Sequence, residues 1–127
     1  MLMLLNQEPG YEKIRDYLNE AQSAQREVLM SAINVGETYY IVHRERGEPA
    51  AEQFLTLLKA TQVLILTPTL EDILAAAKIK AKYPISYADA FAAATAISEA
   101  VPVVTGDPEF QKLERIVTVE WVSNQTR

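Results

Sequence analysis

The sequence predicts a single α/β domain with a parallel or mostly parallel sheet. Short apolar runs typical of buried β-strands alternate with longer segments that repeat their apolar residues at helical spacing. Strands separated by helices are joined by right-handed crossovers, which give a parallel sheet. A chain of 127 residues, 49% of them apolar, is long enough for one domain with a buried core. The expected strands lie near residues 27–33, 62–67, 101–105 and 117–122.

Helices are expected between these strands. Apolar residues recur at helical spacing after each break, and prolines and glycines mark the boundaries. Gly47 is expected to end one helix, Pro49 to begin the next, and Pro84 to stop the one after that. A further helix is rich in alanine, which suits close packing on a sheet. The expected helices cover about residues 11–21, 34–46, 49–60, 70–83 and 88–95.

The composition excludes several classes of protein. The chain has no cysteine, so it has neither a disulfide framework nor a thiolate metal site, and this suits a reducing cytoplasm. Its apolar runs are too short to span a bilayer, so we expect a cytoplasmic protein that does not enter a membrane. The net charge of −5 argues against a protein that coats nucleic acid through its overall charge. It does not exclude a metal-dependent nuclease, whose site carboxylates count as negative until a cation binds. Local cations that could contact nucleic acid, or simply be solvated helix ends, are Arg44, Arg46, Lys78, Lys80 and Lys82.

Three acidic residues are predicted to lie at helix starts, close to strand ends. Asp89 lies in SYADAFAAATA, Asp107 in TGDPEF and Glu37 in SAINVGETYY, each shortly after a side chain of the capping type. Glu37 and Asp107 follow predicted strands, and the carboxyl ends of parallel strands form the edge where open α/β sheets bind ligands. Asp89 comes from a helix–loop–helix connection instead. Oxygen ligands without His or Cys favour Mg²⁺ or Mn²⁺.

Each acid also has a purely structural interpretation. Asn34-x-x-Glu37 and Ser86-x-x-Asp89 match the capping box, and Asp107 matches an N-cap followed by proline. Such a cap contributes about 1 kcal/mol of helix stability and requires no chemistry. If the acids instead converge, their mutual repulsion raises at least one pKa unless a cation neutralises them.

Three segments together resemble a PIN domain: SAINVGETYY, then SYADAFAAA, then VTGDPEF. The chain length resembles the VapC-type toxins of prokaryotic toxin–antitoxin pairs. The resemblance covers nearly the whole chain and implies a three-layer α/β/α sandwich with Mg²⁺- or Mn²⁺-dependent ribonuclease activity. Such hydrolases are often dimeric and often held inactive by a cognate antitoxin. Glu37, Asp89 and Asp107 match three of the family's four acidic positions, which are its metal-binding and catalytic residues. Thr105 matches the hydroxyl residue beside the last acid, and Ser86 the polar residue before the third.

The chain departs from the family pattern at its start. PIN domains open with an apolar strand that ends in an aspartate and is followed by an apolar helix. The segment MLMLLNQEPG resembles that helix, and no aspartate precedes it. We therefore expect the usual first strand to be missing, in a shortened or a degenerate member of the family.

The departure bears on function. Loss of one acid would weaken metal binding and impair the nuclease, and open strand edges would favour repair by dimerisation or by rearrangement of strands. One alternative is a non-catalytic PIN-like protein that binds an antitoxin or RNA. Another is an α/β domain whose acids are only helix caps.

Overall fold

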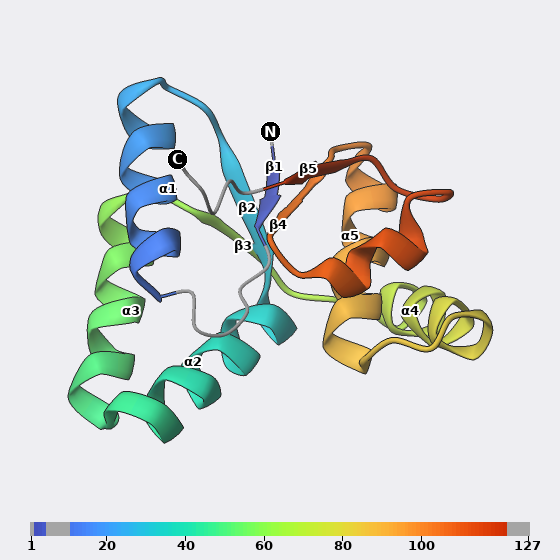
Figure 1. Ribbon diagram of the computed structural model, residues 1–127, viewed down its shortest axis with the longest axis horizontal. Coiled ribbons are helices and arrows are strands. Elements are labelled where there is room, and N and C mark those ends of the chain that lie inside the picture. The colour runs from blue at the N-terminus through green and yellow to red at the C-terminus, as the bar shows by residue number, and fades with distance from the viewer. Residues whose placement is uncertain (1, 5–10, 122–127) are drawn as a thin grey trace.

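The computed structural model describes residues 2–4 and 11–121, which form a five-stranded sheet flanked by helices (Figure 1). The strand order is β3-β2-β1-β4-β5, and all neighbouring strands are parallel. None of the described helices is long and apolar enough to cross a membrane. The strands are β1 (Leu2–Leu4), β2 (Val28–Ser31), β3 (Leu64–Leu66), β4 (Val103–Thr105) and β5 (Val119–Trp121). The helices are α1 (Tyr11–Ser23), α2 (Ala32–Arg46), α3 (Glu48–Ala60), α4 (Leu70–Lys82), α5 (Tyr87–Glu99) and the 3-10 helix η1 (Pro108–Leu113).

The central strand of the sheet is present, so the expectation that it is missing is wrong. Leu2–Leu4 pairs with β2 on one side and β4 on the other, with Met3 opposite both Leu29 and Val103. By pattern alone, a short apolar run such as MLMLL fits a strand as well as a helix. Pairing decides in favour of the strand, because it gives the inner edges of β2 and β4 a hydrogen-bonding partner. Residues 5–10, which follow this strand, lie outside the described part of the chain.

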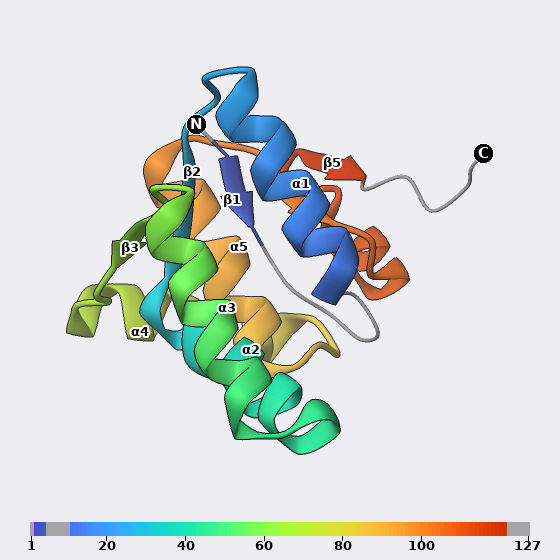
Figure 2. The same cartoon turned by 90° about the vertical axis from the view of Figure 1, so that its left-hand side faces the viewer.

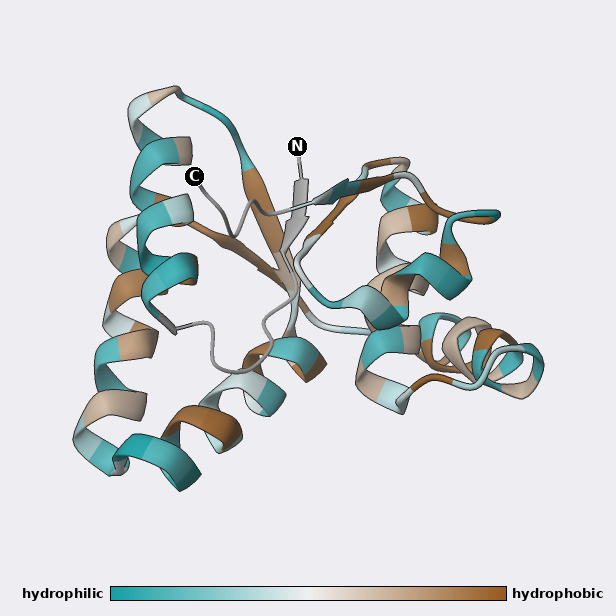
Figure 3. Ribbon diagram, in the orientation of Figure 1, coloured by the Kyte–Doolittle hydropathy of each residue, from teal (hydrophilic) through white to brown (hydrophobic). Residues whose placement is uncertain are grey.

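Helices cover both faces of the sheet, which confirms the predicted three-layer α/β/α sandwich. Helices α1 and α3 lie on one face, and α4 and α5 lie on the other (Figures 1 and 2). Successive strand residues divide between two cores. Leu29 and Val103 pack with α5, whereas Val28, Met30 and Val104 pack with α1 and α3. This is the alternation expected of strand side chains, and Figure 3 shows largely apolar β2, β3 and β4 strands between helices that carry both polar and apolar residues.

Local signals set most of the helix boundaries. Ser31 is the N-cap of α2, since its Oγ accepts a hydrogen bond from the N–H of Ile33 at 3.2 Å. The helix therefore begins at Ala32, slightly before the predicted start at residue 34. Gly47 ends α2 with φ of 92°, a conformation that favours glycine, and Pro49 lies in the first turn of α3 as predicted. Strands β2 to β5 are shorter than predicted but lie within the four predicted ranges, whereas β1 lies outside all of them.

Candidate active site

The elements that carry the three predicted acids meet at one edge of the sheet. Strands β2 and β4 both run parallel to β1 between them, so their carboxyl ends lie at the same edge. Strand β2 leads directly into α2, which carries Glu37, and β4 ends two residues before Asp107. Asp89 lies in the first turn of α5, a helix that contacts α2 as well as β1, β2 and β4.

Asp89 lies within range of the charge of three other carboxylates. Its pKa is raised from 3.8 to about 6, first by burial and then by the negative charge of Asp107. A side-chain hydrogen bond with Ser86 lowers the pKa by a smaller amount, and the charges of Glu109 and Glu37 raise it by less still. The interaction between charges falls with distance, so Asp107, the larger of these contributors, lies within electrostatic range of Asp89. Asp89 therefore titrates close to neutral pH.

Hydrogen bonds orient Asp107 at the end of β4. Its Oδ1 accepts a hydrogen bond from the N–H of Glu109 at 2.9 Å, which makes Asp107 the N-cap of η1 as predicted. The buried Thr105 hydroxyl accepts a hydrogen bond from the N–H of Asp107 at 3.0 Å. A carboxylate has two acceptor oxygens, so an acid that caps a helix through one of them can still bind a cation.

Ser86 fixes the start of α5 in a similar way. Its Oγ accepts a hydrogen bond from the N–H of Asp89 at 3.0 Å. Two lysines, Lys80 from α4 and Lys112 from η1, donate to backbone oxygens of the two residues just before Ser86. The connection between α4 and α5 is thus held from two sides directly before Asp89.

Glu37 does not lie in the first turn of its helix, so this part of the prediction is wrong. With Ser31 as the N-cap of α2, Glu37 falls in the second turn, where it is exposed. Asn34 cannot act as the cap, because the helix has already begun at Ala32. Ser31 takes that role because β2 ends there and its hydroxyl reaches a free N–H of the first turn. Glu37 nevertheless contributes negative charge at Asp89.

Sequence reasoning missed the contact that Asn34 makes. Its side chain is 1% exposed, and its Nδ2 donates to the backbone oxygen of Ala88 at 2.9 Å. Its Oδ1 accepts no hydrogen bond from the described residues. The signal in the sequence is the helical spacing of Asn34, Thr38 and Val42, which are the buried residues of α2. Asn is mostly exposed in folded proteins, so an Asn on the buried face of a helix indicates a specific polar contact.

The donor set suits a hydrated cation. In the part of the chain that the structure describes, no group of three or more His, Cys, Asp or Glu side chains is arranged to hold a metal ion. Asp89 and Asp107 are nevertheless hard oxygen donors whose repulsion a cation would relieve. Mg²⁺ keeps several water ligands and needs only one or two carboxylates. The convergence of Glu37, Asp89 and Asp107 on one ion therefore stays a prediction.

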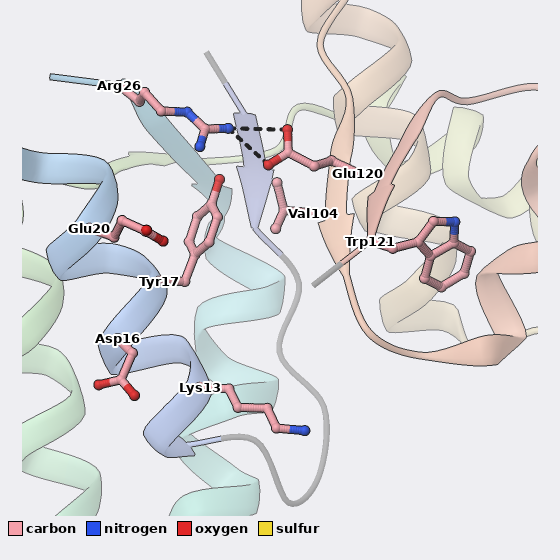
Figure 4. A pocket seen from close by; sticks show the side chains of 8 residues that line it. All are labelled: Lys13, Asp16, Tyr17, Glu20, Arg26, Val104, Glu120 and Trp121. Carbon is pink, nitrogen blue, oxygen red and sulfur yellow. Dashed lines mark hydrogen bonds and ion pairs between the residues drawn. The ribbon is translucent and has the colours of Figure 1, made fainter. Parts of the chain in front are cut away.

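A cavity of about 330 Å³ is lined by none of the predicted site residues (Figure 4). Arg26 and Glu120 form an ion pair at 2.9 Å beside it. Burial, followed by the charge of Glu120, raises the pKa of Tyr17 to about 12. The cavity lining consists of Lys13, Asp16, Tyr17, Glu20, Arg26, Val104, Glu120 and Trp121. The acids at the carboxyl edge of the sheet thus belong to a different site.

Several solved structures share this fold at low sequence identity. VapBC2 from Rickettsia felis, bound to a DNA fragment of its promoter, matches with a TM-score of 0.69 and 16% identity over 95% of this chain and 98% of the other. VapBC-1 from nontypeable Haemophilus influenzae matches with a TM-score of 0.64 and 22% identity over 95% and 96%. VapC20 from Mycobacterium tuberculosis, described as a sarcin-ricin loop cleaving toxin, matches with a TM-score of 0.62 and 17% identity over 81% and 87%.

The family follows from the sequence comparison. No curated protein gave a significant match. The family model of the PIN domain matches residues 1–116, which is most of the chain and includes the segments that carry Glu37, Asp89 and Asp107. The chain belongs to the PIN domain family.

Proposed function

We propose that this PIN domain is a cytoplasmic, divalent-metal-dependent endoribonuclease of a toxin–antitoxin pair. The observation that carries the proposal is the position of Asp89 and Asp107 at the starts of α5 and η1, on the carboxyl side of the sheet of a PIN-family chain, and the raised pKa of Asp89 supports it. Carboxylates brought within range of one another in this way are stabilised by a divalent cation. The likeness in fold to VapBC structures and to VapC20, a sarcin-ricin loop cleaving toxin, supports the toxin class.

Each site residue has a proposed role. Asp89, Asp107 and Glu37 are the metal ligands and the catalytic carboxylates. A bound Mg²⁺ or Mn²⁺ would offset the negative charge that develops on the attacked phosphodiester. The raised pKa of Asp89 belongs to the metal-free protein, and a bound cation would favour the ionised carboxylate that serves as its ligand. Ser86 and Thr105 orient the backbone beside these acids through their hydroxyl groups.

Metal binding and RNA cleavage test the nuclease proposal. Mn²⁺ binding can be followed by water-proton relaxation, and cleavage by digestion of a pool of labelled RNA. Asp107→Asn should keep the fold, because Asn is also a good N-cap. It should lower Mn²⁺ affinity by about tenfold or more and abolish cleavage. Glu99→Gln, at the opposite end of α5 from Asp89, should change neither property. If the wild type binds Mn²⁺ no more tightly than Asp107→Asn does, the site assignment is wrong.

We also propose two protein partners, a cognate antitoxin and a second copy of this chain. The antitoxin is supported by the resemblance to VapC-type toxins and by the shared fold with VapBC structures. The homodimer is supported by exposed apolar side chains on the edge strand β3 and at the start of α4. Repair of a missing strand no longer explains a dimer, because β1 occupies the centre of the sheet.

A second candidate function is that of a non-catalytic PIN-like protein that binds an antitoxin or RNA. It is favoured by the observation that no group of three acids among the described residues is arranged to hold a metal ion. Gel-shift binding of labelled RNA in EDTA distinguishes the two functions. If the wild type binds RNA equally well with and without Mn²⁺ and cuts none of it, the binding function replaces the nuclease.

A further inference from the structure

We propose that Asn34 is a positioning residue that fixes the first turn of α5, and with it Asp89, relative to α2. The inference deepens the metal-dependent function proposed above and rests on it. Helix α2 carries Glu37 and α5 carries Asp89, so the distance between these acids depends on how the two helices are joined. The Asn34 amide joins them directly, because its Nδ2 donates to the Ala88 oxygen at 2.9 Å.

The bond from Asn34 acts on the peptide unit that leads into Asp89. The oxygen of Ala88 and the nitrogen of Asp89 belong to one peptide group, which is planar and rigid. Asn34 donates to the oxygen of this group, and the Ser86 hydroxyl accepts from its N–H at 3.0 Å. The peptide plane is therefore held at both ends, by one side chain from α2 and one from the N-cap of α5. Because this peptide also belongs to α5, loss of either bond would loosen the first turn of the helix at Asp89 without unwinding it.

The Asn34 side chain also buries a second polar atom beside the one that bonds to Ala88. Its Oδ1 is buried and accepts no hydrogen bond from the described residues. Nearly all buried polar atoms in native proteins are hydrogen-bonded, so an unpaired one requires an explanation. An apolar side chain of the same shape would fill this position without an unpaired acceptor.

Thr38 provides a matched control for Asn34. It lies one turn later on the same face of α2 and is also 1% exposed. Its hydroxyl donates within α2, to the Asn34 backbone oxygen at 2.9 Å. Thr38→Val therefore removes a buried polar group from the same helix face without removing the bond to α5. Asn34→Leu removes the bond to α5 and keeps the side-chain shape.

Amide hydrogen exchange tests the positioning role without any metal. In EDTA, exchange at the Asp89 N–H should be about tenfold faster in Asn34→Leu than in the wild type, and unchanged in Thr38→Val. The Tm of Asn34→Leu should equal or exceed that of the wild type, because the unpaired acceptor is gone. Should Asn34→Leu fail to fold, Asn34→Ala is measured in its place with the same expected exchange. Unchanged exchange at Asp89 overturns the positioning role, whether or not the protein binds Mn²⁺.

Mn²⁺ titration of the same proteins connects the positioning role to the site. Asn34→Leu should bind Mn²⁺ about tenfold more weakly than the wild type, whereas Thr38→Val should bind it equally well. A merely structural Asn34 would change the Tm and leave the Mn²⁺ affinity unaltered, which overturns the inference. If the wild type binds no Mn²⁺, the proposed function fails and the role of Asn34 in metal binding fails with it. The exchange data then show separately whether Asn34 holds the turn.

Discussion

At the scale of single residues, helix capping and catalysis need not be alternatives in this protein. The Ser86 and Thr105 hydroxyls each accept a hydrogen bond from the N–H of a predicted catalytic acid, and Asp107 itself caps η1. Each bond satisfies a backbone N–H that would otherwise lack a partner and also fixes the direction of a nearby carboxylate. The residues that start these helices are thus the ones that orient the acids.

Asp89 should make the stability of the metal-free protein fall as pH rises. Its pKa is 3.8 ordinarily and about 6 in the folded state, so the folded protein binds this proton more tightly than the unfolded chain does. Below pH 3.8 Asp89 is protonated in both states and lowers the stability of neither. Between pH 3.8 and about 6 the unfolded chain releases the proton first, so the folded protein loses stability, and above about pH 6 this loss is complete. Asp89→Asn should raise the free energy of unfolding by about 2 kcal/mol at pH 7.5 and by little near pH 4.

Urea unfolding in EDTA at several pH values measures this difference between wild type and variant. Glu99→Gln, a neutralising change at the other end of the same helix, controls for the general effect of net charge. A difference in unfolding free energy between wild type and Asp89→Asn that does not vary with pH would contradict the prediction.

Substitution should separate the two roles of Asp107. Asn keeps an oxygen that can accept a hydrogen bond from the Glu109 N–H, whereas Ala does not. Asp107→Ala should therefore unfold with a free energy about 1 kcal/mol below that of Asp107→Asn. Both variants should lack Mn²⁺-dependent cleavage. Chemical unfolding and an RNA digest measure the two properties independently, and equal stability of the two variants would show that the cap contributes nothing.

The sequence predicts some site residues better than others for a physical reason. Asp89 and Asp107 were correctly placed at helix starts, because an N-cap depends on residues a few positions apart. Glu37 was misplaced by a turn, since Ser31 and Asn34 are both good caps and the choice depends on where β2 ends. The bond from Asn34 spans 54 positions, so no local pattern contains it.

At the scale of secondary-structure elements, helices were easier to predict than strands. Helix ends depend on caps, glycines and prolines that are visible in the sequence, as at Gly47 and Pro49. Strand ends depend on the neighbouring strand. The predicted strand at residues 101–105 shortens to Val103–Thr105, and the opening apolar run becomes β1 because β2 and β4 lie on either side of it.

Two glycines of these helices should respond oppositely to the same substitution. Gly47 has φ of 92°, a region that other residues occupy only with strain, whereas a Cβ at Gly36 inside α2 would meet no atom within 4 Å. Gly47→Ala should lower the free energy of unfolding by about 1 to 3 kcal/mol. Gly36→Ala should raise it by up to about 1 kcal/mol, because alanine favours helix. Thermal unfolding measures the change in stability of each variant. The two variants make the same Gly→Ala change at positions with opposite expected outcomes, so each serves as the control for the other. If Gly47→Ala had a higher Tm than the wild type, a side chain at position 47 would cause no backbone strain and the prediction would be wrong.

At the scale of the whole molecule, the site depends on both helical layers. Helix α5 belongs to the core on one face of the sheet, whereas Val35 and Tyr39 of α2 pack against the core on the other face. The elements that carry the predicted acids, α2, α5 and the end of β4, meet at one edge of the sheet, and the convergence of the acids themselves on one ion remains a prediction. Such a convergence would be a property of the complete fold, so the sequence could suggest it only through the expected strand ends at one sheet edge and through resemblance to a family.

The described surface also carries exposed apolar side chains on the edge strand β3, at Leu64 and Ile65, and an apolar patch on α4 formed by Leu70 and Leu74. These side chains are 50%, 45%, 69% and 51% exposed. Leu70 and Leu74 are four residues apart on one helix, so they lie on the same side of it. Strand β3 is at the edge of the sheet, with one row of its backbone groups unpaired by the other described strands. Apolar side chains beside an open strand edge are typical of an interface.

We predict that this patch is the contact between two copies of the chain. In a symmetric dimer the same patch occurs on both copies, so a charge placed in it enters the interface twice. Leu70→Glu combined with Leu74→Glu should therefore convert the dimer to a monomer, as measured by light scattering during gel filtration, while leaving the fold intact because both side chains are already exposed. Ile97→Glu makes the same chemical change at another exposed apolar residue, near the end of α5, and should remain dimeric. A monomeric wild type at micromolar concentration would contradict the dimer, and loss of the dimer in Ile97→Glu as well would show that the patch is not the contact.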